Sequence, residues 1–468
     1  MWTSTGAASS SWKTWLPEAT RSTQHACPVL TIEAALGYLH ALPRFADRGA
    51  AAYHPGLARM EALMAAMGDP HQAFRSIHVA GTNGKGSTAS MIAAVGTAAG
   101  RRVGLHTSPH LFHLSERMRV DGVPAPEDWL AAAVARYHGA IDAVRPSFFE
   151  ATVALSFRYF ADAGVDDAVV EVGLGGRLDA TNVLRPAVAV ITHIGLDHTE
   201  LLGDTLSLIA REKAGIIKPG VPVVVAAEQP DVLAVLREAA REREAPFHVA
   251  PDEARLHGLR EEVDGLTLHV ETPLRRYDEL FAGLPGLHQS ANARLALRAA
   301  ELAYAEVRRG PAAVYAGLRD VRRLAGLRGR LDVLHRHPLV VADVAHNPDG
   351  LGAALAFTRS RIGAGGRLQV LFGAMRDKDV AAMAHLLAGA GAVVTPVPIP
   401  GERALAAEEL AGLLARFSVL VAPARSAPDG LAHFLRSASP LDALLISGSH
   451  QVVAQLPESG FAPNANFP

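Results

Sequence analysis

A lysine lies among glycines and hydroxyl residues in the stretch HVAGTNGKGSTAS, residues 78–90. Small residues let backbone N–H groups close around phosphate oxygens, and one lysine with one hydroxyl can serve the outer phosphates and a magnesium ion. The stretch follows an apolar, strand-like segment and leads into a pattern of small residues typical of a helix. Its spacing differs from the standard phosphate loop, because Gly86 separates Lys85 from Ser87 and Gly81 lies close to Lys85. We therefore predict a variant nucleotide-binding loop rather than a glycine-rich turn that binds nothing.

Polar side chains also stand at the ends of three other strand-like segments. Ser108 follows RRVGLHT, Glu171 closes DAVVE, and His198 follows AVITHIGLD. Ligands of open parallel sheets collect at the carboxyl ends of strands. Magnesium on a triphosphate takes a few protein oxygens, a role that suits Ser108 and Glu171 better than the softer imidazole of His198. Two alternatives remain open here: Glu171 as a cap of the next turn, and His198 as the start of a helix.

A further candidate is Lys213, in the stretch GDTLSLIAREKAGIIKPG. The pattern predicts a helix capped by Asp204 or Thr205 and stopped by residues 218–220. Lys213 falls in its last turn, where a lysine ordinarily stays solvated and complements the helix dipole. Nothing in the neighbouring residues overturns that expectation.

The elements that must position these residues alternate between strands and helices. Runs at residues 166–173, 187–195 and 220–228 are apolar at successive positions, which is typical of parallel strands covered by helices on both faces. Residues 288–307 predict a strong helix. Residues 256–281 alternate and carry many charges, which indicates a hairpin-rich sheet edge or side layer. Glycine and arginine accumulate at 324–334, where we place a linker, and a second strand–helix series follows it.

Length and composition limit the classes of protein. The chain has 468 residues, which suggests about two to four domains, and its 49% hydrophobic and 20% charged residues favour large buried cores. Lysine plus arginine number 45 against 47 acidic residues, so no overall positive charge indicates a nucleic-acid partner. The single cysteine, Cys27, lies in a Ser/Thr-rich leader at residues 1–29 and fits a reducing cytoplasm. No apolar run reaches membrane-spanning length, so we expect no membrane partner.

Taken together, the chain resembles the folylpolyglutamate synthase/dihydrofolate synthase family of the Mur-ligase superfamily of ATP-dependent amide ligases. The resemblance starts at about residue 30 and leaves out the leader. The matching stretches, in family order, are HVAGTNGKGST, HTSPHL, ERMRVDG, FFEATVAL, EVGLGGRLDATN, ITHIGLDHTELLGDTLSLIAREKAGIIKPG, GRLDVL, DVAHNP and SGSH.

The resemblance implies a role for each matching position. The ATP-binding residues would be Gly81, Thr82, Asn83, Gly84, Lys85, Gly86, Ser87, Asn292, Arg330 and Asp343. The magnesium ligands would be Ser108, Glu171, His198 and Lys213, the last as a carbamate. The folate pocket would be lined by Ser147, Phe148, Phe149, Glu150, Leu178, Asp179 and Ala180. The catalytic residues would be Lys85, Lys213 and His346.

The implied fold is α/β, with an N-terminal P-loop-type parallel-sheet ATPase domain and a smaller C-terminal Rossmann-like α/β domain. We predict a disordered leader at residues 1–29, an ATP-, Mg²⁺- and folate-binding Mur-ligase-type central domain at 30–325, and a glutamate ligase domain at 326–468. The implied activity joins L-glutamate to a pteroate or folate carboxylate through an acyl phosphate, with ATP and Mg²⁺. We expect a cytoplasmic monomer with both dihydrofolate synthase and folylpolyglutamate synthase activities and only small-molecule substrates.

Three other functions compete with this interpretation. A Mur-type cell-wall peptide ligase shares the loop, but TSPHL and FFEATVAL favour folate. A P-loop switch ATPase needs an aspartate at the end of a strand, where this chain has Glu171 before a glycine-rich loop. A non-catalytic nucleotide-binding scaffold would not need the lysine and the candidate metal ligands.

Overall fold

An eight-stranded sheet forms the centre of the N-terminal half, in the order β4-β3-β2-β5-β1-β6-β7-β8. The computed structural model describes residues 30–43 and 56–461, so the expected leader, with Cys27, lies outside the described residues. Six strands are parallel and two add an antiparallel edge. The strands are β1 (Arg75–Ala80), β2 (Val103–His106), β3 (Met118–Val120), β4 (Val123–Pro124), β5 (Asp167–Glu171), β6 (Val188–Ile191), β7 (Val223–Val225) and β8 (Phe247–Val249).

Helices cover both faces of this sheet, as the apolar strands predict. Val169 of β5 faces the core shared with α4, whereas its neighbours Ala168 and Val170 face the core shared with α6. The α-helices are α1 (Ile32–Ala41), α3 (Ala58–Ala66), α4 (Lys85–Ala98), α5 (Glu127–Val144), α6 (Phe148–Asp162), α7 (Thr199–Leu202), α8 (Leu206–Ala214), α9 (Pro230–Glu242) and α10 (Ala250–Glu253). Short 3-10 turns lie at η4 (Pro70–Gln72), η5 (Leu114–Arg117) and η6 (Ala180–Val183).

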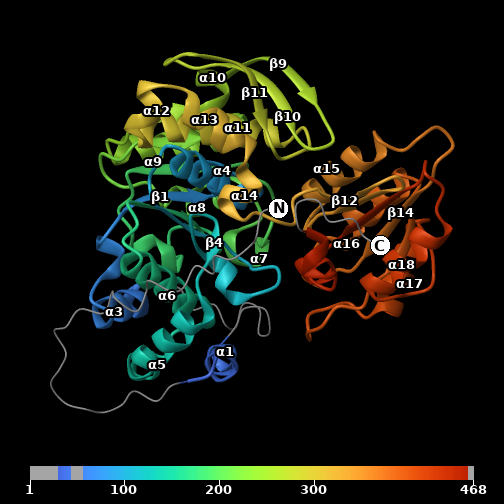
Figure 1. Cartoon of the computed structure of the whole chain (residues 1–468), viewed down its shortest axis with the longest axis horizontal. Coiled ribbons are helices and arrows are strands. Elements are labelled where there is room, and N and C mark those ends of the chain that lie inside the picture. The colour runs from blue at the N-terminus through green and yellow to red at the C-terminus, as the bar shows by residue number, and fades with distance from the viewer. Residues whose placement is uncertain (1–29, 44–55, 462–468) are drawn as a thin grey trace, which may run out of the picture.

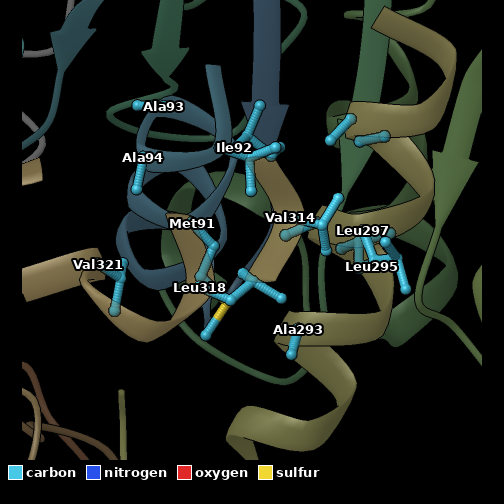
Figure 2. Close-up of a cluster of buried hydrophobic side chains, with 14 of the residues drawn as sticks. Met91, Ile92, Ala93, Ala94, Ala293, Leu295, Leu297, Val314, Leu318 and Val321 are labelled. Carbon is cyan, nitrogen blue, oxygen red and sulfur yellow. The ribbon is translucent and has the colours of Figure 1, made fainter. Parts of the chain in front are cut away.

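The helix α4, which begins at the loop lysine, is buried against later helices. Figure 2 shows its Met91 and Ile92 packed among Leu295, Val314 and Leu318, and all five side chains are buried. The partners are α11 (Gln289–Ala303) and α13 (Ala312–Arg319), followed by α14 (Val321–Ala325). The small residues of α4 allow this close packing, which fixes the orientation of the loop at its start.

The strong helix predicted over 288–307 is interrupted in the structure. It forms α11 and then α12 (Ala305–Arg309), separated at Tyr304, whose φ of −108° and ψ of 119° are extended. The Tyr304 hydroxyl donates a hydrogen bond to the Ile92 carbonyl, 3.4 Å away. Tertiary packing on α4 thus overrides the helical pattern at this residue.

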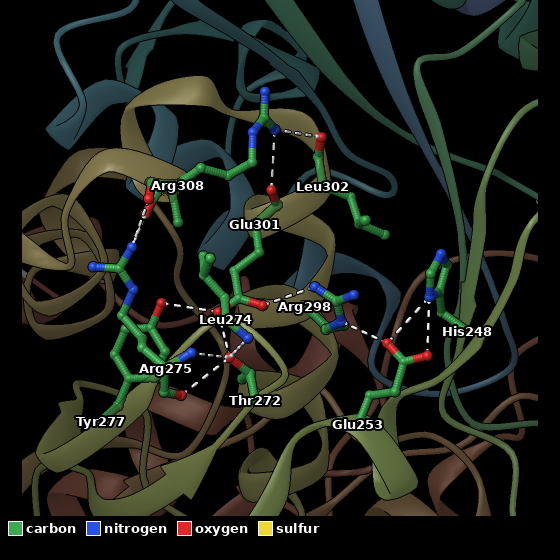
Figure 3. A network of polar contacts seen from close by, with 11 residues as sticks. His248, Glu253, Thr272, Leu274, Arg275, Tyr277, Arg298, Glu301, Leu302 and Arg308 are labelled. Carbon is green, nitrogen blue, oxygen red and sulfur yellow. Dashed lines mark hydrogen bonds and ion pairs between the residues drawn. The ribbon is translucent and has the colours of Figure 1, made fainter.

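A separate antiparallel sheet confirms the side layer predicted from residues 256–281. Its strands are β9 (Arg255–Glu261), β10 (Leu266–Glu271) and β11 (Arg276–Ala282), in the order β11-β10-β9. Figure 3 shows how polar contacts anchor it to α11: the buried Glu301 carboxylate accepts hydrogen bonds from the hydroxyls of Thr272 (2.7 Å) and Tyr277 (3.0 Å). Arg298 pairs with the same carboxylate at 2.8 Å and with Glu253 at 2.6 Å. The network fixes α11, which carries Asn292.

The C-terminal half contains a second α/β unit, which lies beside the N-terminal half (Figure 1). Its strand order is β12-β13-β17-β14-β15-β16, with β12 antiparallel and the others parallel. The strands are β12 (Asp332–Arg336), β13 (Leu339–Ala342), β14 (Leu368–Phe372), β15 (Val393–Pro396), β16 (Leu420–Val421) and β17 (Ala443–Ser447). The helices are α15 (Pro348–Arg359), α16 (Val380–Gly389), α17 (Ala407–Arg416), α18 (Ala427–Ser437) and α19 (His450–Val453), with a 3-10 turn η7 (Glu458–Phe461). These two units confirm the predicted fold class.

The predicted linker lies between α14 and β12. Gly326 and Gly329 have φ of 65° and 71°, the left-handed region that favours glycine. The linker is not loose: the Arg322 guanidinium donates to the Arg330 carbonyl at 2.8 Å, and the Leu331 N–H donates to Asp343 at 2.8 Å. Its backbone is therefore tied to both halves.

No helix within residues 30–43 and 56–461 combines the length and the apolar character needed to cross a bilayer.

Candidate functional site

The glycine-rich loop connects β1 to α4 and needs its glycines for two close approaches. A Cβ at Gly81 would lie 1.7 Å from the Thr192 hydroxyl oxygen. A Cβ at Gly84, where φ is +85°, would lie 2.3 Å from the Asn292 side-chain oxygen. The Lys85 ammonium donates to the Thr82 carbonyl at 3.0 Å, so the lysine folds back over its own loop. The loop therefore has the compact shape that a phosphate-binding turn requires.

A cavity of about 790 Å³ opens at this loop. Both halves of the chain line it, and it brings together all the residues predicted for nucleotide, metal and catalysis. They are Gly81, Thr82, Asn83, Gly84, Lys85, Gly86, Ser87, Ser108, Glu171, His198, Lys213, Asn292, Arg330, Asp343 and His346. Residues that are 265 positions apart in the sequence, such as Gly81 and His346, thus face one space.

Glu171 is a buried carboxylate at the end of β5. It accepts a hydrogen bond from the backbone N–H of Ser108 at 3.0 Å, so it does not cap the turn that follows it. Burial raises the pKa of Glu171, and the nearby charges of Lys85, Arg330 and Arg117 act in the opposite direction. A carboxylate held among cations is suited to a site where phosphate and metal charges meet.

Lys213 is buried, so the solvated lysine expected from the local pattern is wrong. Its side chain is 3% exposed, and its amine donates to the Gly81 carbonyl at 2.8 Å. The helix α8 begins after Thr205, which caps it, and is pressed against the 173–179 loop, where a Cβ at Gly176 would meet the Glu212 carbonyl at 2.9 Å. Burial, with a smaller effect of Lys85, lowers the pKa of Lys213 to about 7. A substantial fraction of this amine is therefore neutral at physiological pH.

His198 lies at the same end of the sheet and precedes the short helix α7. It is the N-cap residue of α7, so a helix does start here: its carbonyl accepts from the N–H groups of Leu201 and Leu202, while its side chain makes no capping hydrogen bond. Burial lowers the pKa of His198 to about 4, although Asp197 opposes the effect. The imidazole is therefore neutral, which is the form in which histidine binds metals.

Sequence reasoning missed Asp197, a residue of the cavity, and the lysine outside the lining that pairs with it. Asp197 lines the cavity, and its carboxylate accepts from the Lys378 ammonium at 2.7 Å. Both side chains are largely buried, at 12% and 9% exposure. The pair joins the two halves of the chain. No local pattern indicates it, because the two residues are 181 positions apart.

The C-terminal half contributes a second group of side chains at the ends of β13 and β17. Asp343 accepts hydrogen bonds from the N–H groups of Leu331 and Ala345, both at 2.8 Å. The His346 ring bonds the Val344 carbonyl through Nδ1 at 3.0 Å, and burial lowers the pKa of His346 to about 4. Next to it, the Asn347 amide donates to the Asn83 side-chain oxygen at 2.9 Å, which ties α15 to the loop.

The residues predicted for folate do not line this cavity. Ser147 and Glu150 form a capping box at the start of α6, and Glu150 also pairs with Arg59 at 3.0 Å. The Phe148 ring lies 5.2 Å from the Arg117 guanidinium. The seven predicted residues are Ser147, Phe148, Phe149, Glu150, Leu178, Asp179 and Ala180.

One of them nevertheless borders the cavity. A Cβ at Gly173, a cavity residue, would lie 2.3 Å from the Phe149 ring. Asp179 is buried and accepts from the N–H groups of Thr181 at 3.0 Å and Leu174 at 2.9 Å. Its direct role in the structure is to hold the loop that leads from Glu171, and thereby to shape the edge of the cavity.

The oxygen and nitrogen donors at the carboxyl ends of β2, β5 and β6 suit a magnesium ion bound together with phosphate. Ser108 and Glu171 supply hard oxygen atoms, and His198 is a neutral imidazole. No three His, Cys, Asp or Glu side chains converge on one point in the described part of the chain.

Comparisons with known proteins give the class and then the family. Residues 79–300 match the Mur ligase middle domain, and residues 329–450 match the Mur ligase, glutamate ligase domain. The fold and the two-sided cavity thus define a Mur-type ligase. The chain is 39% identical over 336 residues to the dihydrofolate synthase/folylpolyglutamate synthase of Bacillus subtilis (strain 168), a match that covers 69% of this chain and 76% of that protein. The chain belongs to the folylpolyglutamate synthase/dihydrofolate synthase family.

Two further relatives agree with this assignment. The folylpolyglutamate synthase of Lacticaseibacillus casei is 36% identical over 78% of this chain and 85% of its own. The crystallised folylpolyglutamate synthase of Mycobacterium tuberculosis, complexed with ADP, superimposes with a TM-score of 0.81 at 32% identity. That superposition covers 93% of this chain and 99% of the other.

Proposed function

We propose that this protein uses ATP to join L-glutamate to the carboxylate of a pteroate or a folate. The observation that carries the proposal is the single cavity in which the loop lysine, Lys85, faces Arg330 and His346 from the other half. A carboxylate is a poor electrophile, so ATP must first convert it to an acyl phosphate. The glutamate amine then displaces phosphate.

The residues around the loop suit the phosphoryl-transfer step. The positive charges of Lys85 and Arg330 both act to lower the pKa of the Glu171 carboxyl group, as expected for three groups that line one cavity. Cations at this place stabilise the negative charge that develops as the γ-phosphoryl group moves. Magnesium, when bound, would neutralise further phosphate charge and fix the phosphate geometry.

The magnesium ligands that we propose are Ser108, Glu171, His198 and the carbamate of Lys213. Support comes from the neutral His198 imidazole and from the lowered pKa of Lys213, since only a neutral amine reacts with carbon dioxide. The folate pocket that we propose lies at the start of α6 and the 178–180 segment. Its support is the contact between the Phe149 ring and Gly173 at the edge of the cavity.

The contacts between the halves suit the protection of an acyl phosphate from water. The Asn347–Asn83 hydrogen bond and the Lys378–Asp197 ion pair both join the C-terminal half to the N-terminal half, and Asn347, Asn83 and Asp197 line the cavity. A cleft held shut in this way excludes water while the reactive intermediate exists. We also propose that the central domain spans residues 30–325 and the glutamate ligase domain residues 326–468, after the leader at 1–29.

Phosphate release on mixing purified protein with ATP and Mg²⁺ tests the proposal. The ligase requires both a pteroate or folate acceptor and glutamate, and the product is a new amide. Phosphate release with neither would indicate a switch ATPase, and release that needs a nucleotide-linked peptide would indicate a cell-wall ligase. No phosphate release under any of these conditions would indicate a binding scaffold.

Bifunctionality is also part of the proposal. The Bacillus subtilis relative carries both names, whereas the Lacticaseibacillus casei relative carries only the polyglutamate name. Parallel assays with dihydropteroate and with a reduced monoglutamyl folate decide between one activity and two. We further propose a cytoplasmic monomer, supported by the near-balanced charge and the single cysteine.

A further inference from the structure

A second, smaller cavity adjoins the first and shares one wall with it. It has a volume of about 40 Å³, and Arg119 and Arg328 are among the residues that line it. Seven residues line both cavities: Gly86, Ser108, Pro109, Glu171, Arg330, Val344 and His450. His450 is the only one of these from the segment after β17, and it begins the short helix α19. Its imidazole therefore stands where the two cavities meet.

The His450 ring differs from its neighbour His346 in how it is held. The His346 ring is fixed through Nδ1 by the Val344 carbonyl, and its Nε2 faces the Asp197 carboxylate at 4.0 Å. The His450 side chain forms no hydrogen bond with any residue of the described chain, although its ring packs 5.7 Å from that of His346. Both of its nitrogen atoms are therefore open to a molecule in the cavity.

Two arginines near His450 are positive: Arg330 from the linker and Arg117 from the β2–β3 connection. Burial lowers the pKa of the neighbouring His110 to about 3 and that of His346 to about 4, and the Glu171 carboxylate lines the same two cavities. With burial, the positive charges lower the pKa of His450 well below its usual value. The ring is thus neutral, and one nitrogen can accept a proton. Anionic substrates raise its basicity when they bind, because they offset these positive charges.

Amide formation needs such an acceptor. An amine that attacks an acyl phosphate becomes positively charged at nitrogen and must lose a proton before the phosphate can leave productively. We propose that His450 is the base that takes this proton from the amine of the incoming L-glutamate. The inference rests on the proposed ligase function and deepens it. The incoming amine reaches this ring from the larger cavity, since the smaller one, at about 40 Å³, has no room for glutamate and its Arg119 and Arg328 already pair with Glu116 and Glu458.

The step balances as follows. Glutamate enters with its α-amine already neutral, having released one proton to solvent. The nitrogen lone pair forms the C–N bond, and its remaining extra proton passes to the free nitrogen of His450. The C–O bond to phosphate then breaks, and the bonding electrons leave with the phosphate. The imidazolium returns its proton to phosphate or to solvent.

Replacing glutamate by hydroxylamine separates this role from the formation of the acyl phosphate. Hydroxylamine is uncharged at neutral pH and attacks acyl phosphates without a base. The experiment measures two rates on one sample of each protein: amide formed with glutamate and hydroxamate formed with hydroxylamine, each with ATP, Mg²⁺ and the pteroate acceptor. The ratio of the two rates does not depend on how much of a variant is folded.

We expect His450→Gln and His450→Asn to lower the amide rate by roughly 100-fold or more and to leave hydroxamate formation within roughly twofold of wild type. His433→Gln, at an exposed position on α18, is the matched control and should change neither rate. An equal fall in both rates, or no fall in either, would overturn the role of His450. A wild-type protein that forms neither product would instead reject the proposed function itself.

Discussion

The amine of Lys213 lies in a place that is unfavourable for an ordinary lysine cation. It is almost completely buried, has one carbonyl partner, and is close to the positive charge of Lys85. An ammonium group in such surroundings loses its proton readily, and a carbamate would turn the same side chain into an anionic oxygen ligand. The structure thus supplies a physical reason for the proposed carbamate, which the family resemblance implies and the local sequence pattern alone does not.

We expect Lys213→Ala to lower turnover by roughly 100-fold or more, because a metal-side oxygen ligand is lost. Acetate or formate should restore part of the activity by occupying the vacated space. Independently of activity, ¹³C NMR of protein equilibrated with ¹³C-bicarbonate should show a carbamate signal in the wild type and none in Lys213→Ala. A wild-type protein without that signal, and a variant that acetate does not rescue, would exclude the carbamate.

Lys85 offers a contrasting prediction, since it is only half-buried and its partner is a loop carbonyl. We expect Lys85→Ala to reduce amide formation by roughly 100- to 1,000-fold through the loss of charge stabilisation at the γ-phosphoryl group. Its thermal unfolding should stay close to that of the wild type, because little apolar packing is removed. Steady-state assays and a melting curve on the same samples test both statements. Normal turnover, or a large drop in melting temperature, would contradict the role assigned to the loop.

At the scale of elements, the loop between β1 and α4 depends on one residue of a distant helix. Asn292 of α11 fills the space beside Gly84, and the Glu301 network holds α11 against the side sheet. The conformation of the loop is therefore set by packing as well as by its own glycines.

Gly84→Ala tests this dependence against Gly100→Ala. Both glycines have φ near +80°, so both substitutions should cost roughly 1 kcal/mol of backbone strain. Only at Gly84 does the new Cβ meet another side chain, whereas Gly100 has open space around it. We expect Gly84→Ala to lower ATP affinity at least roughly tenfold. Gly100→Ala should bind ATP as the wild type does, measured by titration calorimetry. Equal affinities in the two variants would show that the Asn292 contact is unimportant.

The sequence predicted the strands that consist of continuous apolar runs. It did not predict the contacts that these and other elements make with one another. The strands at 166–173, 187–195 and 220–228 were predictable because parallel strands are buried on both faces. The break of the helix at Tyr304 was not, because a hydroxyl contact with Ile92 determines it. Asp197 and Lys378 were missed for the same reason: each looks like a surface residue until the other half of the chain is in place.

At the scale of the whole molecule, two polar contacts join the halves beside the cavity, and ion pairs such as Arg361–Glu261 and Arg336–Asp264 join them elsewhere. The Lys378–Asp197 pair and the Asn347–Asn83 hydrogen bond are both partly shielded from solvent. Such contacts depend on distance and direction, so they no longer stabilise the closed arrangement once the halves separate slightly. The balance between open and closed arrangements should therefore respond to single substitutions.

We expect Lys378→Gln to favour the open arrangement, since it leaves the Asp197 carboxylate without its cation. Trypsin should then cut the linker after Arg328 or Arg330 faster than in the wild type. ATP, Mg²⁺ and acceptor together should slow cleavage strongly in the wild type and less in the variant. Arg376→Gln is the control, because its partner Glu409 is exposed and both lie in the C-terminal half. Cleavage that neither ligands nor Lys378→Gln alter would argue against closure of the cleft.

The position of β17 in its sheet has a consequence for the order in which the protein becomes active during its synthesis. β17 is the last strand along the described chain, yet it lies between β13 and β14. Until residues 443–447 have left the ribosome, the edges of β13 and β14 remain unpaired and open to wrong pairing. His450 follows this strand directly, so the sheet is completed and its ring reaches the cavity almost together. A nascent chain with a finished phosphate loop therefore still lacks the rest of the cavity lining until β17 and His450 have been made.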